Sequence, residues 1–327
     1  MKERSGLRRG GGGMFCRNKA ALWFWIVGTV VVATVVCVTG CTSRGLFGER
    51  LGKEPVLTVY FDEEKRTEKM PFEKYIEGVV AAEMDPKWPR EALAAQAILA
   101  RTFTLERLQR TGGVKKLHGT DVCTSHEHFQ AYDASRVNSL VRAAVRSTRG
   151  KIVTYKGRPI RAWFHSSSGG VTATPAEGLG LPNSVAPYIR TVKDPGAAGK
   201  ESAWKASFSA AEVGRALKKI GGFDGGEPRS IEIVERGPSG RAVTLDIDGK
   251  KVPAPAFRTA VGPDRMLSTL LDGISVKDGK VIMSGRGWGH GVGMSQWGAL
   301  RMSKQGSTAE DIINYYYKGV KIERRWR

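Results

Sequence analysis

Glu83 is the side chain of this sequence with the best setting for acid–base chemistry. It lies near the end of a predicted apolar helix, in VVAAEMDPKWP, directly before a turn that contains two prolines. Ile76, Val79 and Val80 precede it at helical spacing, so Glu83 falls on the face predicted to meet the core. A carboxyl group on that face is poorly solvated, which raises its pKa and suits a general acid. The alternative is a surface glutamate at a helix end, and helix position alone favours that alternative.

Arg101 is a second candidate, because it lies among apolar neighbours within the predicted helix 90–110. A buried arginine needs a partner. Arg101 could bind a substrate oxygen, pair with Glu83, or form a structural salt bridge elsewhere. In a simple antiparallel pair of helices it would lie roughly two to three turns from Glu83. Direct pairing with Glu83 therefore requires the two helices to cross at a wide angle.

Histidine and cysteine are concentrated in the stretch LHGTDVCTSHEHF. These residue types at this density resemble a zinc site. The stretch has little apolar content, so a bound ion would help to order it. Surface histidines without a metal are the alternative. The candidate ligands are His118, Cys123, His126 and His128.

The stretch FHSSSGG ends a predicted strand with hydroxyl groups and glycines. Ser166 and Ser167 could suggest a serine nucleophile, but the sequence around them contains no GxSxG elbow. We therefore expect these two serines to line a polar cleft wall.

Glycine occupies every second position in GRGWGHGVGM, residues 285–294. This period of two predicts an extended segment with one bare face and one loaded face. The bare face could pack on another backbone or admit a ligand. Arginine and tryptophan on the loaded face are a common means of holding a sugar. The residues of the loaded face and those that follow it are Arg286, Trp288, His290, Ser295 and Gln296.

The elements that must position these residues predict an α+β fold with a single mixed domain, 55–327. We expect a helical hairpin over residues 71–110 and antiparallel β-hairpins over residues 151–170 and 230–252. Two helices are predicted to close the chain, and Ser307 and Glu310 fit a capping box at the start of the last one. Helices and hairpins follow one another without a regular βαβ alternation, which favours α+β over a doubly wound sheet.

The N-terminal part predicts a membrane anchor. Residues 21–40 contain no charge and follow a basic tail, residues 1–20. We therefore expect a transmembrane helix over residues 21–40 in the cell membrane, with the basic tail in the cytoplasm. A linker at residues 41–54 would then lead to the domain on the outer side of the cell membrane. The alternative is a lipoprotein signal that ends at Cys41, in VTGC. Of the four cysteines only Cys123 lies in the domain, so no disulfide can form within it.

The chain has a net charge of +20, which favours polyanionic partners. An exported domain has no access to nucleic acid at its place of work. Anionic cell-wall material is therefore the expected partner, and the anionic membrane surface is the alternative.

Three blocks together resemble the stage II sporulation protein D family, which is similar to the amidase-enhancer LytB domain. They are PFEKYIEGVVAAEMDPKWPREALAAQAILARTFTL, FHSSSGG and GRGWGHGVGMSQWGAL. The resemblance extends over nearly all of the external domain. It implies a lytic transglycosylase that acts, during forespore engulfment, on peptidoglycan strands whose peptides an amidase has removed. The amidase and other engulfment membrane proteins are then expected partners.

The resemblance assigns the catalytic acid to Glu83 and matches Arg101 and His290 to motif positions of the family. Some members use a His…Cys…His-Cys zinc set, whereas Phe129 follows His128 here. His126 could substitute, or the metal could be absent; any zinc would be structural, and catalysis needs no cofactor.

A lytic transglycosylase needs one carboxyl group, because the C6 hydroxyl of muramic acid replaces water as the nucleophile. Arg101, His290, Ser295, Gln296 and the serine segment would position the sugar. One alternative is a non-catalytic wall-binding enhancer of an N-acetylmuramoyl-L-alanine amidase. A zinc amidase that uses the His/Cys stretch ranks last.

Overall fold

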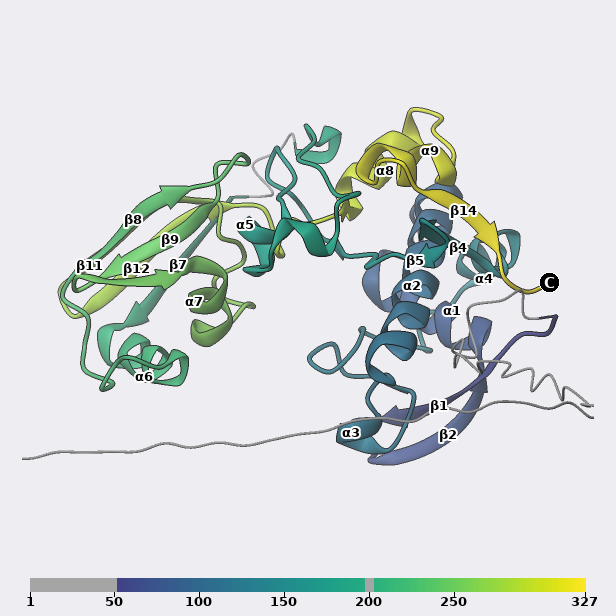
Figure 1. Cartoon of the computed structure of the whole chain (residues 1–327), viewed down its shortest axis with the longest axis horizontal. Coiled ribbons are helices and arrows are strands. Elements are labelled where there is room, and N and C mark those ends of the chain that lie inside the picture. The colour runs from purple at the N-terminus through teal and green to yellow at the C-terminus, as the bar shows by residue number, and fades with distance from the viewer. Residues whose placement is uncertain (1–51, 198–202) are drawn as a thin grey trace, which may run out of the picture. The chain divides into compact units, whose positions relative to one another are not determined.

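A computed structural model describes residues 52–197 and 203–327 of the chain (Figure 1). These residues form a mixed α+β fold, as the sequence predicts. The helices are α1 (Phe72–Glu83), α2 (Arg90–Thr111), α3 (Lys115–His118), α4 (Ser139–Ser147), α5 (Pro175–Leu179), α6 (Ala210–Ile220), α7 (Ala254–Val261), α8 (Gln296–Lys304) and α9 (Ala309–Tyr316).

The strands belong to several small sheets. They are β1 (Val56–Phe61), β2 (Arg66–Pro71), β3 (Val122–Cys123), β4 (Lys151–Tyr155), β5 (Arg158–Pro159), β6 (Phe164–His165), β7 (Ala203–Ser209), β8 (Ile231–Arg236), β9 (Ala242–Ile247), β10 (Lys250–Pro253), β11 (Leu271–Lys277), β12 (Lys280–Arg286), β13 (Met294–Ser295) and β14 (Lys321–Arg324). The sheet orders are β2-β1-β3, β10-β9-β8, β11-β12-β7, β13-β6 and β14-β4-β5.

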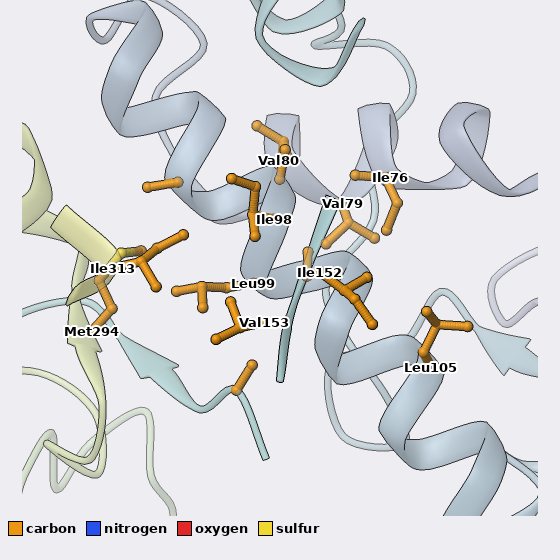
Figure 2. Close-up of a cluster of buried hydrophobic side chains, with 14 of the residues drawn as sticks. Ile76, Val79, Val80, Ile98, Leu99, Leu105, Ile152, Val153, Met294 and Ile313 are labelled. Atoms are coloured by element: carbon orange, nitrogen blue, oxygen red, sulfur yellow. The ribbon is translucent and has the colours of Figure 1, made fainter. Parts of the chain in front are cut away.

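The first hydrophobic core surrounds α2, which packs against α1, α4, α8, α9 and β4. The small and aliphatic residues of α2 allow this, since alanine and leucine favour a helix and fit between close neighbours. Residues distant in sequence meet in this core, among them Ile76, Val79, Val80, Ile98, Leu99, Leu105, Ile152, Val153, Met294 and Ile313 (Figure 2).

A buried ion pair ties this core together. Arg101 is fully buried, and its guanidinium donates to both carboxylate oxygens of Glu73, at 3.1 and 2.7 Å. It also donates to the carbonyl oxygen of Lys151 at 2.9 Å. Glu73 accepts two further hydrogen bonds, from the backbone N–H of Gly150 and the indole N–H of Trp326. The first turn of α1 is therefore joined to α2, to the start of β4 and to the C-terminal segment.

A second cluster of buried side chains lies between residues 204 and 283. It is built from the β11-β12-β7 and β10-β9-β8 sheets with α6 and α7. The alternation of buried and exposed residues along β12 and β7 is the period-two pattern of a strand with one packed face.

The fold-class prediction needs a correction at its N-terminal element. Among the residues that the structure describes, no helix combines the length and apolarity needed to cross a bilayer. The helix predicted over residues 21–40 lies outside the described residues, so the transmembrane element is no part of the observed fold.

The predicted capping box of the last helix is wrong by one position. The N-cap is Thr308, whose hydroxyl accepts from the backbone N–H of Asp311, and the Asp311 carboxylate accepts from the N–H of Thr308. Asp311 fills the role expected of Glu310, because an acid three residues after the cap is what the motif requires.

Replacing Arg101 with Met should destabilise the protein by about 3–5 kcal/mol, because Glu73 would remain buried without its cation. The measurement is the free energy of unfolding in urea. Arg90→Met is the matched control, since Arg90 forms an exposed ion pair with Glu91 and should cost less than about 1 kcal/mol. Equal effects of the two substitutions would contradict the structural role of Arg101.

Candidate functional site

Glu83 is the last residue of α1, and its carboxyl group is enclosed by two other segments. Oε1 accepts a hydrogen bond from the backbone N–H of Ala131 at 3.2 Å. Oε2 lies 3.5 Å from the side-chain amide nitrogen of Gln296, which donates to it. The side chain is only partly exposed, and no cation of the described residues forms an ion pair with it.

Burial raises the pKa of Glu83 from 4.5 to about 7, and the hydrogen bonds from Ala131 and Gln296 lower it in part. Loss of hydration disfavours the charged form, and two neutral donors offset that loss only partially. A carboxyl group with a pKa near the working pH can both donate and accept a proton. The structure thus gives Glu83 the raised pKa expected of a carboxyl group on the core-facing side of the helix.

Gln296 reaches Glu83 because α8 begins beside the serine segment. Ser295 is the N-cap of α8: it is fully buried, and its hydroxyl accepts from the backbone N–H of Gly298 at 3.1 Å. This corrects the prediction that Ser295 binds substrate. The backbone N–H of Trp297 donates to the carbonyl oxygen of Ser166 at 3.1 Å.

Ser166 and Ser167 occupy different environments. Ser166 is partly exposed beside the start of α8, which leaves its side chain accessible to a ligand. Ser167 is buried, and its backbone exchanges two hydrogen bonds with Trp288. Ser167 therefore joins two loops and does not face solvent, which corrects its predicted role in substrate binding.

The alternating glycines do not form an extended segment, which corrects that prediction. β12 ends at Arg286, and the next four alternate glycines have φ between 76° and 101°, a region that favours glycine. A Cβ on Gly293 would lie 1.9 Å from the carbonyl oxygen of Trp163, and one on Gly291 would lie 2.5 Å from the guanidinium carbon of Arg241. The bare side of this loop thus meets protein atoms.

Among the described residues, no hydrogen bond joins His290 to Glu83. The His290 Nδ1 accepts from the backbone N–H of Val292 at 3.0 Å, and its ring lies 5.8 Å from that of His165. Burial lowers the pKa of His290 well below its usual value, and the positive charges of Arg258 and Arg241 lower it further, so the ring stays neutral. His290 therefore supports the glycine loop; the residue is partly exposed, and its contact with substrate stays a prediction.

Arg101 forms its hydrogen bonds with residues other than Glu83. Its donors are used by Glu73 and the Lys151 carbonyl, and the side chain has no exposed surface. Of the alternatives that the sequence leaves open, the structural salt bridge is the one observed.

Two features beside the site were missed from the sequence. Trp88, in the turn after α1, and Trp297, in the first turn of α8, pack edge to face with ring centroids 5.3 Å apart. Arg241 is fully buried and donates to the carbonyl oxygens of Ser168 and Val171, which fixes the loop after the serines. The position of Trp297 directly after Gln296 was a usable signal, whereas nothing local marks Arg241.

The His/Cys stretch meets an acid from elsewhere in the chain. Ligand atoms of Asp62, His118, Cys123 and His128 all lie within 4.8 Å of one another. Asp62 follows β1, and β1 pairs parallel with β3, so that Tyr60 lies opposite Cys123. His126 is exposed and is not one of the four, which corrects its place in the predicted set. One carboxylate, one thiol and two imidazoles are a donor set that suits tetrahedral zinc.

The comparisons with known proteins agree on the family. A family model described as stage II sporulation protein matches residues 60–155, and a domain of unknown function matches 187–293. Stage II sporulation protein D of Bacillus subtilis is 36% identical over 296 residues, covering 86% of this chain and 82% of the relative. The protein of that name from Bacillus amyloliquefaciens is 33% identical, covering 84% and 82%. An amidase enhancer of Bacillus subtilis is 28% identical, covering 76% of this chain and 40% of that protein.

Gln296→Leu should raise the pKa of Glu83 above its value of about 7. The amide of Gln296 stabilises the charged carboxylate, and the substitution removes that hydrogen bond. The measurement is a carbon-13 NMR titration of glutamate carboxyl groups, with Glu83→Gln used to assign the resonance. A wild-type midpoint near 4.5, or a lower midpoint in the variant, would contradict the described environment.

Proposed function

The chain belongs to the stage II sporulation protein D family, and on that premise we propose that it is a lytic transglycosylase. Its substrate is the bond between N-acetylmuramic acid and N-acetylglucosamine in peptide-stripped peptidoglycan strands. The observation that carries this proposal is Glu83, a single enclosed carboxyl group with a pKa of about 7. The family itself assigns the chain a role in sporulation.

In the proposed reaction, protonated Glu83 donates its proton to the oxygen of the scissile bond, and the bond from that oxygen to C1 of muramic acid breaks. The charge that develops on the sugar is oxocarbenium-like. The carboxylate then accepts the proton of the C6 hydroxyl as its oxygen bonds to C1, which closes a 1,6-anhydro ring. Glu83 ends protonated, so the cycle uses one carboxyl group and no water.

The neighbours of Glu83 suit both halves of this cycle. The Ala131 N–H and the Gln296 amide donate to the carboxylate that exists after the first proton transfer. They are neutral, so they hold the carboxylate in place without fixing it in the charged form as a cation would. Ser166 is partly exposed beside α8, which supports its proposed role in binding a sugar hydroxyl.

The place of work that we propose is the cell envelope during forespore engulfment. Of the net charge of +20, residues 1–20 carry +5, from six basic residues and one acid, and the remaining +15 suits strands that carry lactyl carboxylates after peptide removal. An amidase that produces such strands, and other engulfment membrane proteins, are the proposed partners.

A second candidate function rests on the similarity to the amidase enhancer. In that case the chain binds the wall and stimulates an N-acetylmuramoyl-L-alanine amidase without cleaving glycan. The environment of Glu83 favours the enzyme, since a binding module has no need of a carboxyl group with a raised pKa.

Asp62, His118, Cys123 and His128 are the proposed ligands of a structural zinc ion. Bound zinc would join the 118–128 stretch to the end of β1 and would take no part in proton transfer. Asp62 would supply the ligand that Phe129 does not.

Glu83→Gln should abolish release of 1,6-anhydro products from peptide-stripped strands, because the amide cannot donate the required proton. Wild-type activity should fall as the pH rises above about 7, since the acid must be protonated. Mass spectrometry of the soluble products gives both results. Anhydro products from Glu83→Gln at the wild-type rate would sink the assignment. Retained amidase stimulation with no cleavage by either form would favour the enhancer function.

Zinc content tests the proposed metal site. Wild-type protein and His126→Ala should each hold one zinc per chain by elemental analysis, whereas Asp62→Ala should lose most of it, because three ligands remain. Chelation should lower the thermal midpoint of the wild type and leave that of Asp62→Ala unchanged. Zinc loss from His126→Ala with full retention by Asp62→Ala would restore the ligand set expected from the sequence.

A further inference from the structure

Trp88 and Trp297 form an aromatic pair that is partly open to solvent. The two rings pack edge to face at a centroid distance of 5.3 Å, and Trp297 keeps 40% of its surface exposed. An exposed pair of large aromatic rings is typical of a recognition surface, because it offers apolar area and indole N–H donors to a ligand.

Hydrogen bonds fix the backbone that carries each indole, and the two rings pack on each other. Trp88 lies in a tight turn, and its backbone N–H donates to the carbonyl oxygen of Asp85. The backbone N–H of Lys87 donates to Asp85 Oδ1. A proline precedes Lys87 and another follows Trp88. Trp297 follows the Ser295 cap and donates its backbone N–H to Ser166. A preorganised aromatic surface binds a ring with little loss of conformational entropy.

The pair is joined to the acid by short connections. Gln296, which precedes Trp297, donates to Glu83 Oε2, and Trp88 lies in the turn that follows Glu83 at the end of α1. A pyranose ring that stacks on these indoles would thus lie beside the carboxyl group that protonates the scissile bond.

We propose that Trp88 and Trp297 form a sugar-stacking subsite for the residue next to the scissile bond of the glycan strand. This inference rests on the proposed function, because it takes the glycan as the ligand. The apolar face of a pyranose matches an indole face, and the indole N–H groups can donate to ring hydroxyls.

The surroundings favour a glycan over an apolar protein partner. Lys87 and Arg90 are exposed before and after Trp88 in the chain, and Glu83 is joined to Gln296, the neighbour of Trp297. Burying these charges against an apolar surface would be unfavourable. A strand that carries lactyl carboxylates would instead find cations beside the stacking surface.

The test measures binding without catalysis. Full-length Glu83→Gln protein is titrated by calorimetry with a peptide-free tetrasaccharide of alternating N-acetylglucosamine and N-acetylmuramic acid. Adding Trp297→Ala or Trp88→Ala should weaken binding about tenfold. Trp297→Phe should retain most of the affinity, because a ring remains. Ile282→Ala is the matched control: Ile282 is exposed to a similar degree on β12, and its removal should leave binding unchanged.

The outcomes separate the subsite from the reaction. Unchanged affinity in both tryptophan variants, with their folding confirmed by circular dichroism, would overturn the subsite even if the wild type cleaves strands. Weakened affinity in these variants would support it even if the wild type releases no anhydro product. In the active protein, Trp297→Ala should raise KM and leave kcat nearly unchanged, whereas a structural defect would lower kcat.

Discussion

The buried pair of Arg101 and Glu73 is the interaction on which the first core depends. Glu73 accepts from the guanidinium, from Gly150 and from Trp326, so one carboxylate joins α1, α2, β4 and the C-terminal segment. A charge with this many partners cannot move without leaving buried groups unsatisfied. Glu73 lies in the first turn of α1 and Glu83 at the end of the same helix. The ion pair of Glu73 with Arg101 therefore fixes the helix that carries Glu83.

The two glutamates of α1 show how environment divides one residue type between two roles. Glu73 forms an ion pair with Arg101 and stabilises the fold. Glu83 meets only neutral donors from Ala131 and Gln296, and burial raises its pKa to about 7. The sequence singled out both Glu83 and Arg101, yet Arg101 has no exposed surface, whereas Glu83 is partly exposed.

Local patterns predicted the elements well and long-range partners poorly. The spacing of apolar residues and the positions of the prolines predicted α1 and α2. The helical spacing of Glu83 from the apolar residues before it also predicted that its carboxyl group would be poorly solvated. Spacing could not reveal that the glycines after Arg286 adopt positive φ, since alternation looks the same in a strand and in this loop. The partners Glu73–Arg101, Asp62–Cys123 and Trp88–Trp297 come together only through tertiary packing, so no local pattern announces them.

In the proposed reaction a single carboxyl group suffices, and water is not a reactant. The direct test is cleavage of peptide-stripped strands in water enriched in oxygen-18, with mass spectrometry of the new muramic acid ends. We expect 1,6-anhydro ends that carry no heavy oxygen, because the C6 hydroxyl supplies the oxygen that reaches C1. Reducing ends that contain oxygen-18 would show hydrolysis and contradict the account.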